Sequence, residues 1–231
     1  MPTNQSKPIY LMAGRGGNNA SIIQSVFKDA GVPRPKVAYI GVASGDNYGF
    51  YLMISRMIKA AGDCAVKRVV IAPPESDLNK ARAALESADV IFMSGGDVEE
   101  GMQVLQAKGL VELLSDLFRR GKVFFGASAG SIMLAREWVR WPDPEDDSSA
   151  ELFSCLGMAP VLCDTHAEED DWEELKAALR LSPEGTQGYG IATGACLKVY
   201  PDGREEALGS PVAVYTRQGG KAIKLAALTP G

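Results

Sequence analysis

The order of apolar runs and helical patterns is the feature that most limits the fold of this 231-residue chain. Brief apolar runs bounded by Gly, Pro or Asp are typical of buried strands. They occupy residues 8–13, 36–42, 66–72, 90–94 and 123–126. Helical patterns lie between them, at 20–30, 48–61, 78–87 and 98–120, with a break in the last one near Gly109. Because repeated strand–helix–strand units cross over right-handedly, we predict a doubly wound α/β fold with a largely parallel sheet and helices on both faces.

The second half of the chain departs from this rhythm. Residues 138–150 contain two prolines among several carboxylates and are interpreted as a loop. We expect a strand at 159–165 and a helix from about 170 to 181, and then strands within 189–200 and 212–225 around a turn at 201–203. No repeat or linker marks a boundary, so residues 1–231 are predicted to form a single α/β domain.

Composition excludes several classes of function. A net charge of -5 without clustered Lys and Arg argues against a nucleic-acid partner. The sequence has neither a signal-peptide pattern nor an apolar stretch of about 18 residues, so we expect a cytoplasmic protein with no membrane partner. The four cysteines lack Cys-x-x-Cys spacing, and His166 is the single histidine. We therefore expect no metal and no organic cofactor.

Ser128 is the candidate nucleophile. It is the centre of Gly126-Ala127-Ser128-Ala129-Gly130, a Gly-x-Ser-x-Gly motif between a predicted strand and a predicted helix. Small residues permit the strained turn of a nucleophile elbow, and the helix that follows directs backbone N–H groups at the site. A serine needs a base to take its proton, and His166, which ends the apolar run 161–165, is the one imidazole available.

The carboxylate that would orient the imidazole is ambiguous. Asp143 lies in the proline-rich loop, whereas Glu168 forms a His-x-Glu pair with His166. The neighbouring acids of the loop remain open as alternatives, namely Glu145, Asp146 and Asp147.

A second glycine turn is expected to complete the site. Gly96, in the stretch 92–100, offers a backbone N–H that could face that of Ala129 across an oxyanion. Gly95 and Asp97 beside it are candidate substrate-binding residues, and Arg15 is assigned to the wall of the site. A phosphate cradle is the alternative for this turn, but no Gly-Lys-Ser/Thr follows it.

These motifs together resemble the dipeptidase E and cyanophycinase family of serine peptidases. The resemblance rests on the serine motif, on Ser94-Gly95-Gly96-Asp97 and on Asp164-Thr165-His166. It implies the class I glutamine amidotransferase-like fold, Ser128 as nucleophile, His166 as base, and Gly96 and Ala129 as oxyanion donors. It further implies Asp143 as the acid, while Glu168 would mimic the His-x-Glu pair of the amidotransferases.

The expected function is that of a cytoplasmic serine peptidase acting on small peptides or isopeptide, cyanophycin-like bonds, which could be a homodimer. The family tends to follow its histidine with an aromatic residue and arginines, but here Ala167 and an acidic run to Glu174 occupy that place. Aspartyl substrates are therefore not expected, unless Arg15, Arg136 or Arg140 supplies the charge. The acidic run itself is interpreted as a solvated first turn of a helix rather than as an attractor for cationic substrates. Two alternatives are a non-catalytic binding protein and an amidotransferase-like subunit with a synthase partner.

Overall fold

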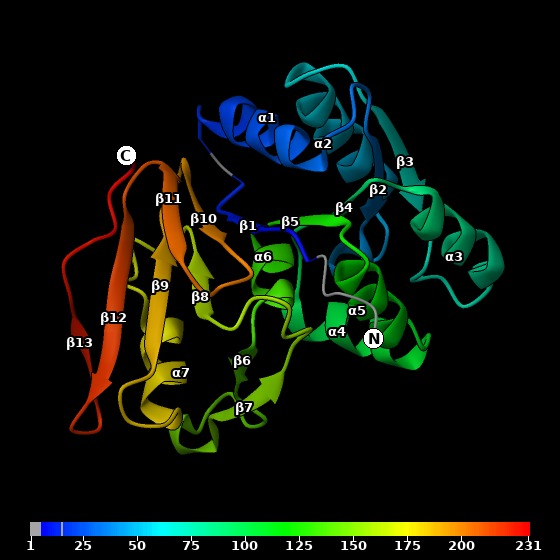
Figure 1. Cartoon of the computed structure of the whole chain (residues 1–231). Helices are drawn as coiled ribbons and strands as arrows, with labels where there is room; N and C mark the ends of the chain where they lie inside the picture. Colours follow the sequence, from blue (N-terminus) through cyan, green and yellow to red (C-terminus); the bar gives the residue numbers. More distant parts are fainter. Residues whose placement is uncertain (1–5, 15) are drawn as a thin grey trace.

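A seven-stranded sheet forms the centre of the computed structural model, which describes residues 6–14 and 16–231 (Figure 1). The strand order is β11-β10-β1-β5-β4-β2-β3. The five parallel strands are β1 (Ile9–Met12), β2 (Lys36–Ile40), β3 (Ala65–Val69), β4 (Val90–Met93) and β5 (Val123–Ala127). Two antiparallel strands extend the sheet beyond β1, namely β10 (Ala195–Val199) and β11 (Glu205–Gly209).

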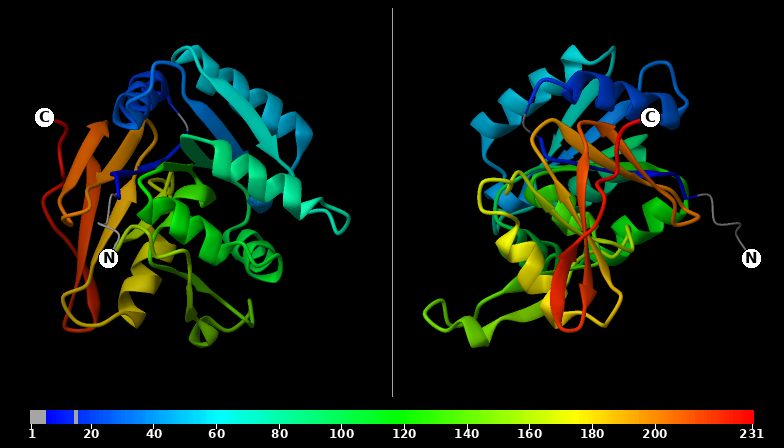
Figure 2. Two further views of the ribbon diagram at one scale, coloured as in Figure 1. Left: turned by 45° about the vertical axis from the view of Figure 1, so that its right-hand side comes forward. Right: turned by 90° about the vertical axis from the view of Figure 1, so that its left-hand side faces the viewer.

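Helices cover both faces of this sheet (Figures 1 and 2). One face carries α1 (Asn19–Ala30) and α2 (Tyr48–Ala60). The other carries α3 (Leu78–Ser87), α4 (Val98–Ala107), α5 (Val111–Arg119) and α6 (Ala129–Leu134). Alternate side chains of β1 enter opposite layers, since Tyr10 packs with α1 and α2 whereas Leu11 packs with the second group. The prediction of a doubly wound α/β fold is confirmed.

Local chemistry sets several element ends in the first half of the chain. Asp77 caps α3 by accepting a hydrogen bond at Oδ1 from the N–H of Lys80, at 3.1 Å. Gly31 ends α1 in the left-handed conformation, with φ of 74°. Gly109, with φ of 60°, separates α4 from α5 at the predicted break.

The second half differs from the prediction in its strands. The segment interpreted as a loop begins as a strand, because β6 (Glu137–Arg140) pairs with β7 (Glu151–Ser154), and only the connection, with the short helix η2 (Asp147–Ser149), is irregular. The segment 189–200 divides into β9 (Gln187–Ile191) and β10, and 212–225 divides into β12 (Val212–Gln218) and β13 (Lys221–Lys224). Strand β11 was not predicted, because its charged sequence gives little apolar signal before it pairs with β10.

A second sheet, in the order β13-β12-β9-β8, stands beside the central one (Figure 1). Strand β8 (Leu162–Thr165) of this sheet begins later than the strand predicted at 159–165. Helix α7 (Glu173–Leu181) likewise begins later than the helix predicted from about 170 to 181. A glycine in β9 lets the ring of Trp172 pack directly against this sheet, since a Cβ on Gly190 would lie 2.6 Å from that ring. Among the helices of the described chain, none has the length and apolar character needed to cross a bilayer.

Candidate active site

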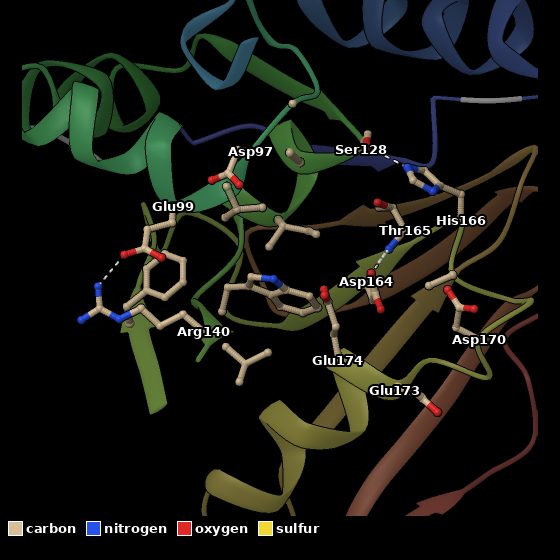
Figure 3. A pocket seen from close by; sticks show the side chains of 18 of the residues that line it. Asp97, Glu99, Ser128, Arg140, Asp164, Thr165, His166, Asp170, Glu173 and Glu174 are labelled. Carbon is tan, nitrogen blue, oxygen red and sulfur yellow. Dashed lines mark hydrogen bonds and ion pairs between the residues drawn. The ribbon is translucent and has the colours of Figure 1, made fainter. Parts of the chain in front are cut away.

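Ser128 and His166 meet, although they come from different sheets. The hydroxyl Oγ of Ser128 lies 2.8 Å from Nε2 of His166, within hydrogen-bonding distance (Figure 3). Ser128 follows β5 of the central sheet, and His166 follows β8 of the second sheet. The arrangement therefore has the contact that general-base activation of a serine requires.

The turn around Ser128 needs its small residues for steric reasons. Ser128 has φ of 55° and ψ of -131°, which few non-glycine residues adopt. A Cβ on Gly126 would lie 2.5 Å from the backbone of Gly130, and one on Gly130 would lie 2.1 Å from the carbonyl oxygen of Met93. Helix α6 can therefore begin directly against strands β4 and β5 only if these positions lack side chains.

The turn at Gly95-Gly96 lies against the serine. A Cβ on Gly95 would lie 3.0 Å from that of Ser128, and one on Gly96, where φ is 144°, would lie 1.8 Å from the carbonyl oxygen of Ala43 in η1 (Val42–Ser44). Ala129 is the first residue of α6, so its N–H has no acceptor within the helix. Gly96 and Ala129 both line the same cavity as Ser128. Asp97 also lines it, while its Oδ1 accepts a hydrogen bond from the N–H of Glu100 at 2.8 Å.

A cavity of about 520 Å³ opens beside the Ser128–His166 pair. Part of its wall is aromatic, from Trp138, Trp141 and Phe153, which the β6–β7 hairpin presents. The sequence does not predict this wall, because the prolines and carboxylates of 138–150 favour a loop over a hairpin. The aromatic and β-branched pair Trp138-Val139 is the signal that could have revealed the strand.

Six carboxylates also line the cavity, namely Asp97, Glu99, Asp164, Asp170, Glu173 and Glu174. Arg140 lines it as well, but it forms an ion pair with Glu99 at 2.7 Å (Figure 3). It forms a second ion pair with Glu151 at 2.6 Å. The lining is therefore strongly negative.

Asp164 is the most buried of these acids. Its residue is 4% exposed, and Oδ1 accepts a hydrogen bond from the N–H of Thr165 at 2.7 Å. Oδ2 is buried without a hydrogen-bond partner among the described residues. Burial raises the pKa of Asp164 to about 7, and the charges of Glu174 and Asp170 act in the same direction, while the backbone N–H groups of Thr165 and Leu175 act to lower it. Partial burial, with the charges of Asp170 and Asp97, also raises the pKa of Glu174.

Glu168 lies within electrostatic reach of His166. Its Oε1 accepts a hydrogen bond from the N–H of Thr193 at 3.1 Å. Partial burial acts to raise the pKa of Glu168, but the hydrogen bonds from Thr193 and the charge of His166 outweigh it and lower the pKa.

Asp143 occupies a different environment. It is exposed in the connection between β6 and β7, where its Oδ1 accepts a hydrogen bond from the N–H of Glu145 at 3.1 Å. Asp146 likewise binds within the connection, to Ser148, and none of the acids of this connection is among the residues lining the cavity. Arg136 pairs with Glu137 at 2.6 Å, and Arg15 lies outside the described residues.

The described residues include no group of three or more His, Cys, Asp or Glu side chains arranged to hold a metal ion. All four cysteines lie in the described part of the chain, and none of them lines the cavity. The nucleophile that the geometry offers there is a serine.

Comparison with known proteins identifies the family. The sequence profile of peptidase family S51 matches residues 10–206. The chain belongs to peptidase family S51. It is a serine-type peptidase, as the motifs around Ser128 and His166 predicted.

Individual relatives of this peptidase share a quarter or less of its residues in the aligned regions. The uncharacterized peptidase YgaJ of Bacillus subtilis (strain 168) is 25% identical over 227 residues, which cover 95% of this chain and 92% of YgaJ. Peptidase E of Escherichia coli (strain K12 / DH10B) is 25% identical over 148 residues, 60% of this chain and 63% of peptidase E. The crystal structure of a peptidase from an acI-B1 Actinobacterium superposes with a TM-score of 0.76 at 16% identity, covering 98% of both chains, and so shares the fold.

Proposed function

We propose that this peptidase hydrolyses small peptides or isopeptide bonds with Ser128 as nucleophile and His166 as general base. The contact of 2.8 Å between Oγ and Nε2 is the observation that carries the proposal. The cavity beside it has room for a short peptide, because ligand pockets typically span about 300–1,000 Å³.

The reaction follows from these positions. Oγ of Ser128 attacks the scissile carbonyl carbon while Nε2 of His166 accepts the hydroxyl proton, and the carbonyl oxygen becomes an oxyanion. The N–H groups of Gly96 and Ala129 are the proposed donors to that oxyanion. His166 then protonates the leaving amine, and a water, activated by the same imidazole, hydrolyses the acyl-enzyme. Every proton moves between the substrate, water and groups of this chain.

We further propose that Glu168 orients the imidazole. The electrostatic attraction between Glu168 and His166 and the hydrogen bond from Thr193 support this role. Asp143, which the family resemblance implies, remains the alternative. A cytoplasmic location, a single domain, the absence of a nucleic-acid partner and a homodimeric assembly stay predictions from the sequence.

A fluorophosphonate probe with mass-spectrometric mapping tests the nucleophile. We expect covalent labelling at Ser128, none in Ser128→Ala, and labelling slower by roughly 10³-fold or more in His166→Gln, because removing one member of a triad costs that much. Ser21→Ala, which removes an exposed hydroxyl on α1, is the matched control and should be labelled like the wild type. A folded protein that is not labelled at Ser128 and cleaves no member of a dipeptide library would instead favour the non-catalytic binding protein.

A further inference from the structure

We infer that the acidic wall of the cavity binds a positively charged group of the substrate, an ammonium or a guanidinium, so that the enzyme prefers cationic peptides. We call Asp164, Glu174 and Asp170 the acidic subsite. The inference rests on the proposed function, because it assigns the substrate class of the same cavity.

Among the described residues, no Lys or Arg forms an ion pair with the acidic subsite. Within residues 6–14 and 16–231, Arg140 is the one Arg or Lys that lines the cavity, and it already binds Glu99 and Glu151. Figure 3 shows Asp164, Glu174 and Asp170 on the side of the cavity away from that arginine. An incoming cation is therefore the group that this wall lacks.

Asp164 supplies the second and independent observation. Its side chain is almost fully buried at the cavity wall, and Oδ2 has no hydrogen-bond partner in the described chain. Burying a carboxylate oxygen without a partner is costly, and the charge of a cation bound beside Asp164 in the cavity reduces that cost. The raised pKa of Asp164 reflects the same unfavourable surroundings.

The position of the subsite fits recognition close to the scissile bond. Asp164 lies in β8 and His166 directly follows its last residue, and both line the same cavity. A substrate whose carbonyl reaches Ser128 would thus bring a neighbouring residue to the acidic subsite. The aromatic wall from Trp138 and Phe153 can cover the alkyl stem of a basic side chain.

The cation could come from the α-amino group of a short peptide or from a Lys or Arg side chain. Both are donors to carboxylates and share the chemistry that the subsite selects. The two sources are separated by acetylating the α-amino group and by replacing Lys with norleucine, which keeps the alkyl chain and removes the charge.

The test uses internally quenched tetra-alanine peptides with Lys or norleucine at one position at a time, each with a free and an acetylated α-amino group. We expect kcat/KM to be about tenfold higher for the charged member of at least one matched pair, since a charge-assisted hydrogen bond contributes about 1.5–3 kcal/mol. A preference for Lys identifies the side chain as the source, and a preference for the free α-amino group identifies the terminus.

Two variants test the assignment to these carboxylates. Glu174 is exposed, so Glu174→Gln should fold normally. Asp164→Asn keeps a side-chain oxygen that can accept the hydrogen bond from the N–H of Thr165. Each should reduce the charged-to-neutral ratio about threefold or more, mainly through KM. Glu169→Gln, which makes the same change in net charge at an exposed residue outside the cavity lining, should leave the ratio unchanged.

The outcomes distinguish this inference from the proposed function. Equal kcat/KM for charged and neutral members of every pair, in an enzyme labelled at Ser128, would overturn the inference alone. Loss of labelling and of all cleavage would overturn the proposed function. In that case calorimetric titration of the wild type with the same peptides decides the inference, with tighter binding of the charged members supporting it and equal binding overturning it.

Discussion

Ser128 and His166 both adopt backbone conformations that are rare for residues with side chains. Their φ angles are 55° and 46°, in the left-handed region. Such conformations cost of order 1–3 kcal/mol each and persist where the surrounding packing enforces them. Here the N–H of Ser128 donates to Met12 at 3.0 Å, and that of His166 donates to Ile191 at 2.9 Å. Hydrogen bonds to neighbouring strands thus hold the backbone at Ser128 and His166, whose side chains are in contact.

At the same scale, the orienting carboxylate can be tested directly. We expect Glu168→Gln to lower kcat between about tenfold and 10⁴-fold with little change in KM, because loss of the carboxylate partner of a catalytic histidine misorients the ring. Glu168→Asp should restore part of the activity. The measurement is steady-state kinetics on the best peptide substrate.

Asp143→Asn is the matched control for this substitution. It removes one negative charge from an exposed connection whose hydrogen bonds are local, so activity should stay within about twofold. If Asp143→Asn abolishes activity while Glu168→Gln does not, the acid implied by the family resemblance is the correct one.

At the scale of elements, the junction of β5 and α6 decides whether the nucleophile can be presented. Gly130→Ala should destabilise the protein by about 3 kcal/mol or more, because the new methyl group would lie 2.1 Å from the carbonyl oxygen of Met93. Labelling of Ser128 should be lost even where the variant still folds. Urea unfolding and fluorophosphonate labelling measure the two effects.

Gly49→Ala serves as the comparison within a helix. Gly49 lies in the first turn of α2, and the nearest neighbour of its new Cβ would be Oδ1 of Asn47 at 3.4 Å. Alanine should change the free energy of unfolding there by no more than about 1 kcal/mol, in the stabilising direction. Equal stability of the two variants would show that the junction tolerates a side chain and that our steric explanation is wrong.

At the scale of the whole molecule, a continuous apolar core links the two sheets. One cluster contains Leu11 and Phe124 of the central sheet together with Leu162, Ile191 and Val214 of the second. We propose that residues 1–231 unfold as one cooperative unit, as expected for a single domain. A perturbation at β8 should then shift the entire unfolding transition.

Asp164→Asn provides that perturbation and has a defined pH dependence. The pKa of Asp164 is raised from 3.8 to about 7 by burial, so this group lowers the stability of the wild type progressively as pH rises from about 4 to 7. Below about pH 4 the two proteins should be similarly stable. At pH 8 the variant should be more stable by roughly 2–4 kcal/mol.

Thermal unfolding at pH 4 and pH 8, followed by near- and far-ultraviolet circular dichroism, measures this prediction. The two probes should give one transition at each pH, and the midpoint of the variant should exceed that of the wild type only at the higher pH. Two separate transitions would contradict unfolding as a single cooperative unit. A variant less stable than the wild type at pH 8 would contradict the destabilising burial of the Asp164 carboxylate.

The sequence by itself determined the doubly wound architecture and identified Ser128 and His166 as the candidate nucleophile and base. Periodicity and glycine or proline boundaries are local properties, and a Gly-x-Ser-x-Gly turn between a strand and a helix is visible in a few consecutive residues. Both residues follow apolar runs, which already placed them at strand ends.

Tertiary structure decided the rest. Contacts between distant segments place β8 in a second sheet and make the β6–β7 hairpin the aromatic wall. They also bring Asp164 and Glu174 to one cavity. The charged strand β11 exists only because β10 pairs with it. Glu173 and Glu174 form the exposed first turn of α7, as the sequence predicted. Only the packing of α7 against β8 shows that these two residues, with Asp170, also line the cavity.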